Sequence, residues 1–102
     1  MDKSNVAEQI GQAWITFRKG QLDAAASAFQ DLANRNNDNI DAHYGLGLVQ
    51  RSQGNREAAS RSFQKAGSLI EAALQNDPSS DRLEILQRMV QQRLNEVTGV
   101  AH

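Results

Sequence analysis

Few side chains in this sequence are of the types that carry out catalytic chemistry. The chain has two histidines, His43 and His102, and no cysteine, which excludes disulfides, thiolate metal sites and a cysteine nucleophile. No carboxylate stands at a metal-ligand spacing from either histidine. The serines lack the context of a nucleophile turn, and the glycines form no phosphate loop. We therefore predict that the chain is not an enzyme and holds no metal or cofactor.

Other side chains of the sequence are of the types that bind partner proteins. Trp14, Phe17 and Tyr44 are three of the five aromatic residues, and Arg18 and Arg51 follow them in the sequence. Tryptophan, tyrosine and arginine are the residue types most enriched at the energetic centres of protein interfaces. Whether these side chains form one surface depends on the elements that carry them.

Charge and hydropathy limit the classes of partner. The formal net charge is −1, with 11 basic and 12 acidic residues. Binding to nucleic-acid phosphates needs a surplus of lysine and arginine on one face, which this balance does not supply. No apolar run approaches the ~20 residues of a membrane span, and the first residues lead into no apolar signal segment. We expect no nucleic-acid partner, no membrane association and a cytoplasmic location.

The composition and the apolar spacing predict helices. Proline occurs once, alanine is abundant and β-branched residues are sparse, a combination that favours helix over sheet. Apolar residues recur at helical intervals, as in Leu22, Ala25, Phe29 and Leu32. We predict five helices, over residues 5–19, 22–34, 39–53, 56–75 and 80–98, and an all-α fold.

Local stop and start signals separate these helices. Gly20 and Gly54 each follow a helix, where glycine adopts a positive φ without a Cβ penalty. Asn55 is a candidate N-cap for the fourth helix. Pro78 ends that helix, and Ser80 or Asp81 is expected to cap the fifth.

The first part of the chain also resembles the part that follows it. Sliding the sequence along itself until Gly11 meets Gly45 superposes identical residues where a helical hairpin needs a small residue, a helix breaker or an aromatic ring. The identical pairs are Gly11/Gly45, Gly20/Gly54, Ala24/Ala58, Ala25/Ala59, Phe29/Phe63 and Gln30/Gln64. This internal repeat predicts two equivalent units, residues 6–39 and 40–73.

These units resemble the tetratricopeptide repeat. The second unit carries Leu46-Gly47 followed by Ala59 and Phe63 four residues apart, and the first carries Ala25 and Phe29 at the same spacing. The resemblance implies a single domain over residues 1–102: two helix-turn-helix hairpins in a right-handed α-solenoid, with a C-terminal capping helix over 80–98. Two features depart from the family pattern. The second helix of unit two is longer than in the family and extends to about residue 76. Arg56 stands where the family has an aromatic or aliphatic residue.

The resemblance further implies a concave groove lined by the first helix of each hairpin. The matching positions are Ile10, Trp14, Phe17, Arg18, Tyr44, Leu48 and Arg51, with Ile85 and Met89 on the fifth helix. We expect the groove to bind a protein or peptide partner through its aromatic residues, with Arg18 and Arg51 contacting an acidic group. His43 stands at a large packing position of the family and is expected to be structural.

Two other interpretations remain open. Trp14 and Phe17 are equally well explained as core residues, because aromatic residues at helical spacing usually pack inside a protein. The groove or the fifth helix could also pair with a second copy of the chain, which would make this a self-assembly module and a homodimer.

Overall fold

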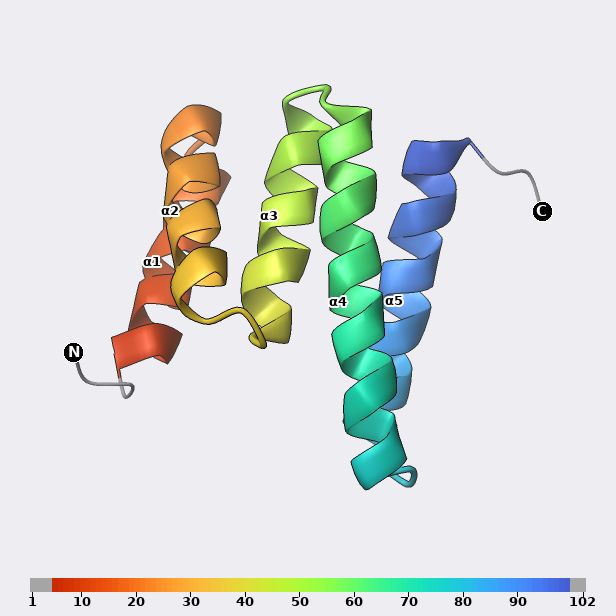
Figure 1. Ribbon diagram of the computed structural model, residues 1–102. Coiled ribbons are helices and arrows are strands. Elements are labelled where there is room, and N and C mark those ends of the chain that lie inside the picture. Colours follow the sequence, from red (N-terminus) through yellow and green to blue (C-terminus); the bar gives the residue numbers. More distant parts are fainter. Residues whose placement is uncertain (1–4, 100–102) are drawn as a thin grey trace.

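The computed structural model describes residues 5–99, which form five α-helices joined by short turns (Figure 1). The helices are α1 (Asn5–Arg18), α2 (Leu22–Arg35), α3 (Ile40–Ser52), α4 (Arg56–Asn76) and α5 (Asp81–Thr98). This part of the chain contains no strand, so the predicted all-α class is confirmed. Each helix begins and ends within one residue of its predicted position.

Side-chain caps explain where three helices begin. The side-chain oxygens of Asn39, Asn55 and Ser80 accept hydrogen bonds from the backbone N–H three residues on, at 3.0, 3.3 and 3.2 Å respectively. Such bonds satisfy amides that have no partner within the helix. Asn55 therefore caps α4 as predicted, and Ser80, one of the two predicted candidates, caps α5.

The turns after α1 and α3 have the same geometry. Gly20 and Gly54 have φ values of +80° and +82°. The N–H of Gly20 donates to the carbonyl of Phe17 at 2.9 Å, and the N–H of Gly54 donates to the carbonyl of Arg51 at 3.0 Å. Since the two donors are repeat equivalents, as are the two acceptors, the sequence repeat reappears in the backbone hydrogen bonds of both turns.

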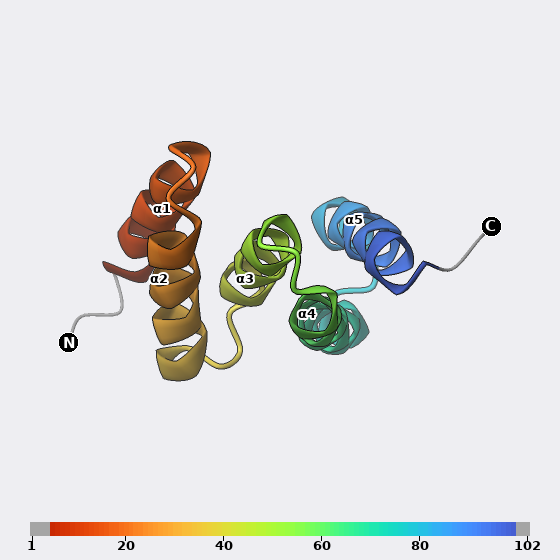
Figure 2. The same cartoon turned by 90° about the horizontal axis from the view of Figure 1, so that it is seen from above.

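Each helix packs against the helices before and after it in the chain, and α1 also touches α3. Viewed from above, α1, α3 and α5 lie on one side of the molecule, and α2 and α4 lie on the other (Figure 2). The helix α3 therefore has neighbours on both flanks. It contributes residues to both of the hydrophobic cores.

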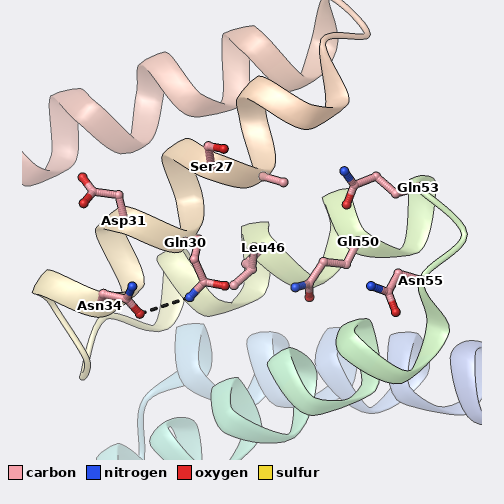
Figure 3. A pocket seen from close by; sticks show the side chains of 9 residues that line it. Ser27, Gln30, Asp31, Asn34, Leu46, Gln50, Gln53 and Asn55 are labelled. Atoms are coloured by element: carbon pink, nitrogen blue, oxygen red, sulfur yellow. Dashed lines mark hydrogen bonds between the residues drawn. The ribbon is translucent and has the colours of Figure 1, made fainter.

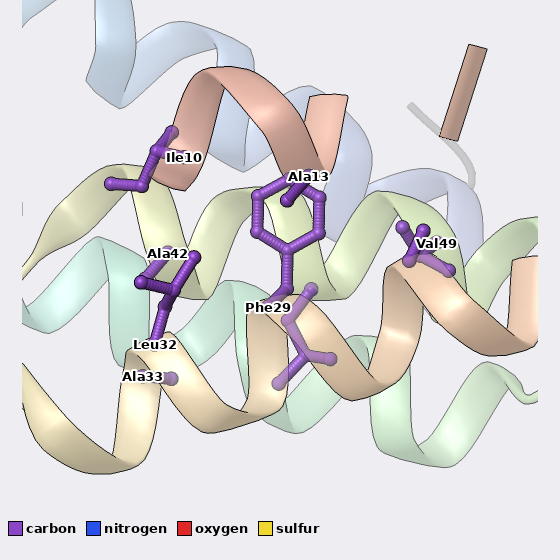
Figure 4. Close-up of a cluster of buried hydrophobic side chains, with 9 residues drawn as sticks. Ile10, Ala13, Phe29, Leu32, Ala33, Ala42 and Val49 are labelled. Carbon is purple, nitrogen blue, oxygen red and sulfur yellow. The ribbon is translucent and has the colours of Figure 1, made fainter. Parts of the chain in front are cut away.

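The first core lies among α1, α2 and α3, and the second lies among α3, α4 and α5. The first contains the fully buried Phe29 and is shown in Figure 4. The second contains Phe63, which is fully buried as well. Ala25 and Ala59, which the repeat pairs, have no exposed surface and allow close approach of their neighbours. The two cores thus use residues that are equivalent in the repeat.

Two glycines allow α3 to fit between these cores. A Cβ at Gly45 would lie 2.4 Å from the ring of Phe29, and a Cβ at Gly47 would lie 2.5 Å from the ring of Phe63. Real Cβ atoms essentially never show contacts below 3.0 Å. The two phenylalanine rings therefore rest directly on the backbone of α3.

Arg56, the departure from the family pattern, has a specific role at the end of α5. Its Nε donates to the carbonyl of Val97 at 3.1 Å, and its Nη2 donates to the carbonyl of Glu96 at 3.1 Å. The last carbonyls of a helix have no partner within that helix. The first residue of α4 thus satisfies the C-terminal end of α5, which explains a polar residue at a position where an apolar one was expected.

Candidate binding surface

The nine predicted groove residues all lie on the three helices that share one side of the molecule. Helix α1 carries Ile10, Trp14, Phe17 and Arg18, α3 carries Tyr44, Leu48 and Arg51, and α5 carries Ile85 and Met89. Figure 2 shows α3 set back between α1 and α5 on this side. We call this side of α1, α3 and α5 the concave face.

Two of the nine residues are core residues. Ile10 and Tyr44 are each 8% exposed. Ile10 belongs to the first core, and Tyr44 packs against Phe63 in the second with ring centroids 5.8 Å apart. These side chains support the concave face from beneath, because neighbouring helices leave them little surface to offer a partner.

Trp14 is both packed against the core and partly exposed. Its ring packs edge-on against Phe29, with centroids 5.1 Å apart and an interplanar angle of 74°. It also contacts Phe17 at 6.1 Å and packs against both hydrophobic cores. Trp14 is nevertheless only half-buried. The indole is therefore part of the packing of the monomer and part of its surface at once.

An apolar hollow of about 480 Å³ adjoins Trp14 on α1. It is lined by Gly11, Trp14, Ile15, Phe17 and Arg18. A Cβ at Gly11 would meet no atom within 4 Å, so this glycine leaves open space. Ile15 is 41% exposed and is one of three exposed large hydrophobic residues among residues 5–99. We call this feature the α1 hollow.

Sequence reasoning did not place Gly11 and Ile15 in the candidate site. The repeat pairs them with Gly45 and Val49, and Val49 is fully buried. In the described part of the chain, α2 covers Gly45, whereas no helix covers Gly11. Ile15 is aliphatic like its equivalent Val49, but no helix precedes the first unit in the described residues to cover it. This was the signal from which an uncovered apolar surface could have been predicted.

The two predicted anion-binding arginines differ in their surroundings. Arg51 on α3 pairs with the carboxylate of Glu96 on α5, and Arg93 pairs with the other oxygen of the same carboxylate at 2.9 Å. Arg18 is exposed beside the α1 hollow and has no ion pair within residues 5–99. Arg51 therefore forms an ion pair that links α3 to α5, whereas the described residues leave the guanidinium of Arg18 free to bind an acidic group of a partner.

The two predicted groove residues of α5 are exposed. Ile85 is 55% exposed and Met89 is 38% exposed. Residues four and seven positions apart share a helix face, so Met89 lies on the same side of α5 as Arg93 and Glu96. Because Glu96 contacts α3, this side of α5 borders the concave face. Leu48, half-buried on α3, packs against the second core.

His43 has a structural partner. It is 8% exposed, and its Nε2 lies 2.9 Å from the carbonyl oxygen of Asn37, to which the N–H tautomer donates. This contact joins α3 to the segment that precedes it. Among residues 5–99, no three histidine or acidic side chains gather in a way that could hold a metal ion. His102 lies outside the described residues.

Within the same residues, no helix is both long and apolar enough to cross a membrane. Comparison with known proteins gave no family model that matches the chain and no match among curated proteins.

Proposed function

We propose that this chain is a small adaptor of the tetratricopeptide type that binds a peptide or helical segment of a partner protein on its concave face. Residues 6–39 and 40–73 would form two equivalent hairpins of a right-handed solenoid, and α5 would cover its end. The chain would act by binding, without catalysis, metal, cofactor or nucleic acid. The absence of cysteine suits the cytoplasm as its location.

The equivalence of the two hairpins rests on contacts that recur at matching positions of the repeat. The turns at Gly20 and Gly54 share their φ values and hydrogen bonds. Phe29 and Phe63 are both fully buried, and so are Ala25 and Ala59. A stack of such units offers a preformed surface, so little conformational entropy is lost on this side when a partner binds.

The observation that carries the binding proposal is the α1 hollow, because three of its lining residues, Trp14, Phe17 and Arg18, belong to the concave face. Exposed apolar residues that are contiguous, rather than scattered singly, mark interaction sites on protein surfaces. Trp14, Phe17 and Ile15 provide apolar walls, and Arg18 provides a cation at the rim. This chemistry suits a segment that inserts one apolar or aromatic side chain and carries an acidic group next to it.

The single tryptophan makes this proposal directly testable. Peptides selected from a random display library on the wild-type chain should shift the emission of Trp14 when they bind, because Trp14 lines the hollow. Ile15→Ser should weaken that binding by roughly tenfold, the loss expected when most of one aliphatic contact is removed. Ala72→Ser, at an exposed position of α4, is the matched control.

Arg18→Gln separates the ionic contribution from the apolar one. It should weaken the binding of acidic peptides more at low salt than at high salt, because exposed charges are screened. Selected peptides that bind equally well to the Ile15→Ser variant and leave the Trp14 emission unchanged would refute a site at the hollow.

A second candidate function is self-assembly, and the exposed apolar residues of α5 favour it. Ile85 and Met89 lie four residues apart and present two of the three most exposed large apolar side chains described. Light scattering on dilution would detect a dimer that dissociates. In that case Ile85→Ser and Met89→Ser should abolish the dimer, whereas the adaptor function predicts a monomer over the same concentrations.

A further inference from the structure

A second cavity lies on the opposite side of α3 from the concave face. It is open to solvent, has a volume of about 430 Å³ and is lined by residues of α2, α3 and the start of α4 (Figure 3). On α3 it is lined by Leu46, Gln50 and Gln53. These positions are about half a helical turn away from Tyr44, Leu48 and Arg51, so the two surfaces use opposite faces of one helix.

This cavity, which we call the amide cleft, is lined mainly by neutral carboxamides. They are Gln30 and Asn34 on α2, Gln50 and Gln53 on α3, and the N-cap residue Asn55. Each of these five side chains can both donate and accept hydrogen bonds.

On α3 and at the start of α4, three of these carboxamides have one end fixed by the protein. The Oε1 of Gln50 accepts from the hydroxyl of Ser62, a buried residue, at 2.7 Å. The Nε2 of Gln53 donates to Asp23 at 2.9 Å. The Oδ1 of Asn55 accepts the capping bond from the backbone of α4.

On α2, two further carboxamides bind each other. The Nε2 of Gln30 donates to the Oδ1 of Asn34 at 3.1 Å, the bond drawn in Figure 3. Each of the five side chains therefore uses one of its two amide atoms in a hydrogen bond within the protein. Held side chains lose less rotamer freedom when they bind a ligand.

The other end of each carboxamide makes no hydrogen bond to the described residues. Two acceptors remain, the Oε1 atoms of Gln30 and Gln53. Three donors remain, the amide nitrogens of Asn34, Gln50 and Asn55. The cleft therefore presents three neutral donors and two neutral acceptors, next to apolar surface from Leu46 and Ala26.

We propose that the amide cleft binds the main chain of an extended polypeptide segment. An extended main chain offers N–H and C=O groups in alternation, and neutral carboxamides complement both. No aromatic ring lines the cleft, so it lacks the stacking surface that bases and sugars use. Its only charged lining residue is Asp31, which opposes a phosphate. This site goes beyond the proposed function, because it lies away from the concave face.

The side-chain amide signals of the uniformly ¹⁵N-labelled chain provide the test. The probe is a blocked hexapeptide of alternating serine and alanine, titrated to millimolar concentration. The NH₂ signals of Asn34, Gln50 and Asn55 should shift, while those of Gln75 and Gln91, exposed elsewhere on α4 and α5, should stay in place. The same peptide with N-methylated main-chain amides should bind more weakly and produce smaller shifts at the same concentration, because its carbonyls can still accept but it cannot donate to the two acceptors.

A pair of variants completes the design. Gln30→Met combined with Gln53→Met keeps the length of both side chains and removes both acceptors. This should weaken peptide binding by about tenfold, the effect expected for two neutral hydrogen bonds. Gln75→Met combined with Gln91→Met should leave binding unchanged.

Three results would overturn the proposal. They are cleft signals that do not move with the blocked peptide, equal binding of the N-methylated peptide, and a shift that a neutral oligosaccharide produces and the peptide does not. Unchanged circular dichroism of the Met variants would confirm that they fold.

Discussion

Replacing Gly45 with alanine should destabilise the protein, whereas the same replacement at Gly11, its equivalent in the first repeat unit, should stabilise it. Both glycines lie inside helices, where alanine is favoured by about 1 kcal/mol. A Cβ at Gly11 meets no atom within 4 Å, so this gain is not opposed. At Gly45 the Cβ would lie 2.4 Å from the ring of Phe29.

The size of the effect at Gly45 follows from this geometry. An ordinary contact begins at 3.4 Å, so the ring must move by about one ångström. Phe29 is fully buried, so neighbouring core side chains would have to move with its ring. Overpacking of this kind costs about 3 kcal/mol at the upper end of its range. After the helix-propensity gain, the free energy of unfolding should fall by about 2 kcal/mol, which corresponds to a lower Tm by roughly 8–16 °C.

Urea unfolding followed by circular dichroism measures both variants. Phe29→Leu provides a double-mutant cycle, because the smaller side chain leaves room for the new methyl group. Gly45→Ala should therefore cost less in the Phe29→Leu background than in the wild type. A Gly45→Ala variant as stable as Gly11→Ala would refute the packing of Phe29 against the backbone of α3.

Three further outcomes are expected. Arg56→Met should lower the free energy of unfolding by about 1–2 kcal/mol, since two carbonyls at the end of α5 lose their donor, and hydrogen exchange near Val97 should accelerate. Ser80→Ala should cost about 1 kcal/mol by chemical denaturation, because it removes the N-cap of α5. Glu96→Gln should cost less than about 1 kcal/mol, since Glu96 is exposed and its ion pairs with Arg51 and Arg93 are reached by solvent, and the cost measured by thermal melts should shrink at high salt.

The helices could be predicted because their signals are local. Gly20, Gly54, Asn55 and Pro78 each end or begin a helix through the conformation or hydrogen bonding of a few neighbouring residues. Such preferences act in any fold. The internal repeat added the pairing of Phe29 with Phe63, and both are fully buried.

The exposure of the candidate site could not be predicted in the same way. Tyr44 and Trp14 both stand at positions assigned to the groove, yet Tyr44 is 8% exposed and Trp14 is half-buried. The difference depends on which helices lie beside each residue in space. The bond between Arg51 and Glu96 joins residues 45 positions apart, and nothing in the repeat pairs them. Ile15 differs from its equivalent Val49 for the same reason: only the second has a helix over it.

The neighbour-to-neighbour packing of the five helices has a consequence for how the chain folds. Apart from the contacts between α1 and α3 and the ion pair between Arg51 of α3 and Glu96 of α5, the helices pack mainly against helices adjacent in sequence. Short chain separations between contacting residues make loop closure inexpensive in entropy, and chains of low contact order reach their native state in microseconds to milliseconds. Folding can begin at any pair of neighbouring helices and proceed to the helices on either side. We expect α3, with partners on both flanks, to exchange its amide protons last and α1 to open first.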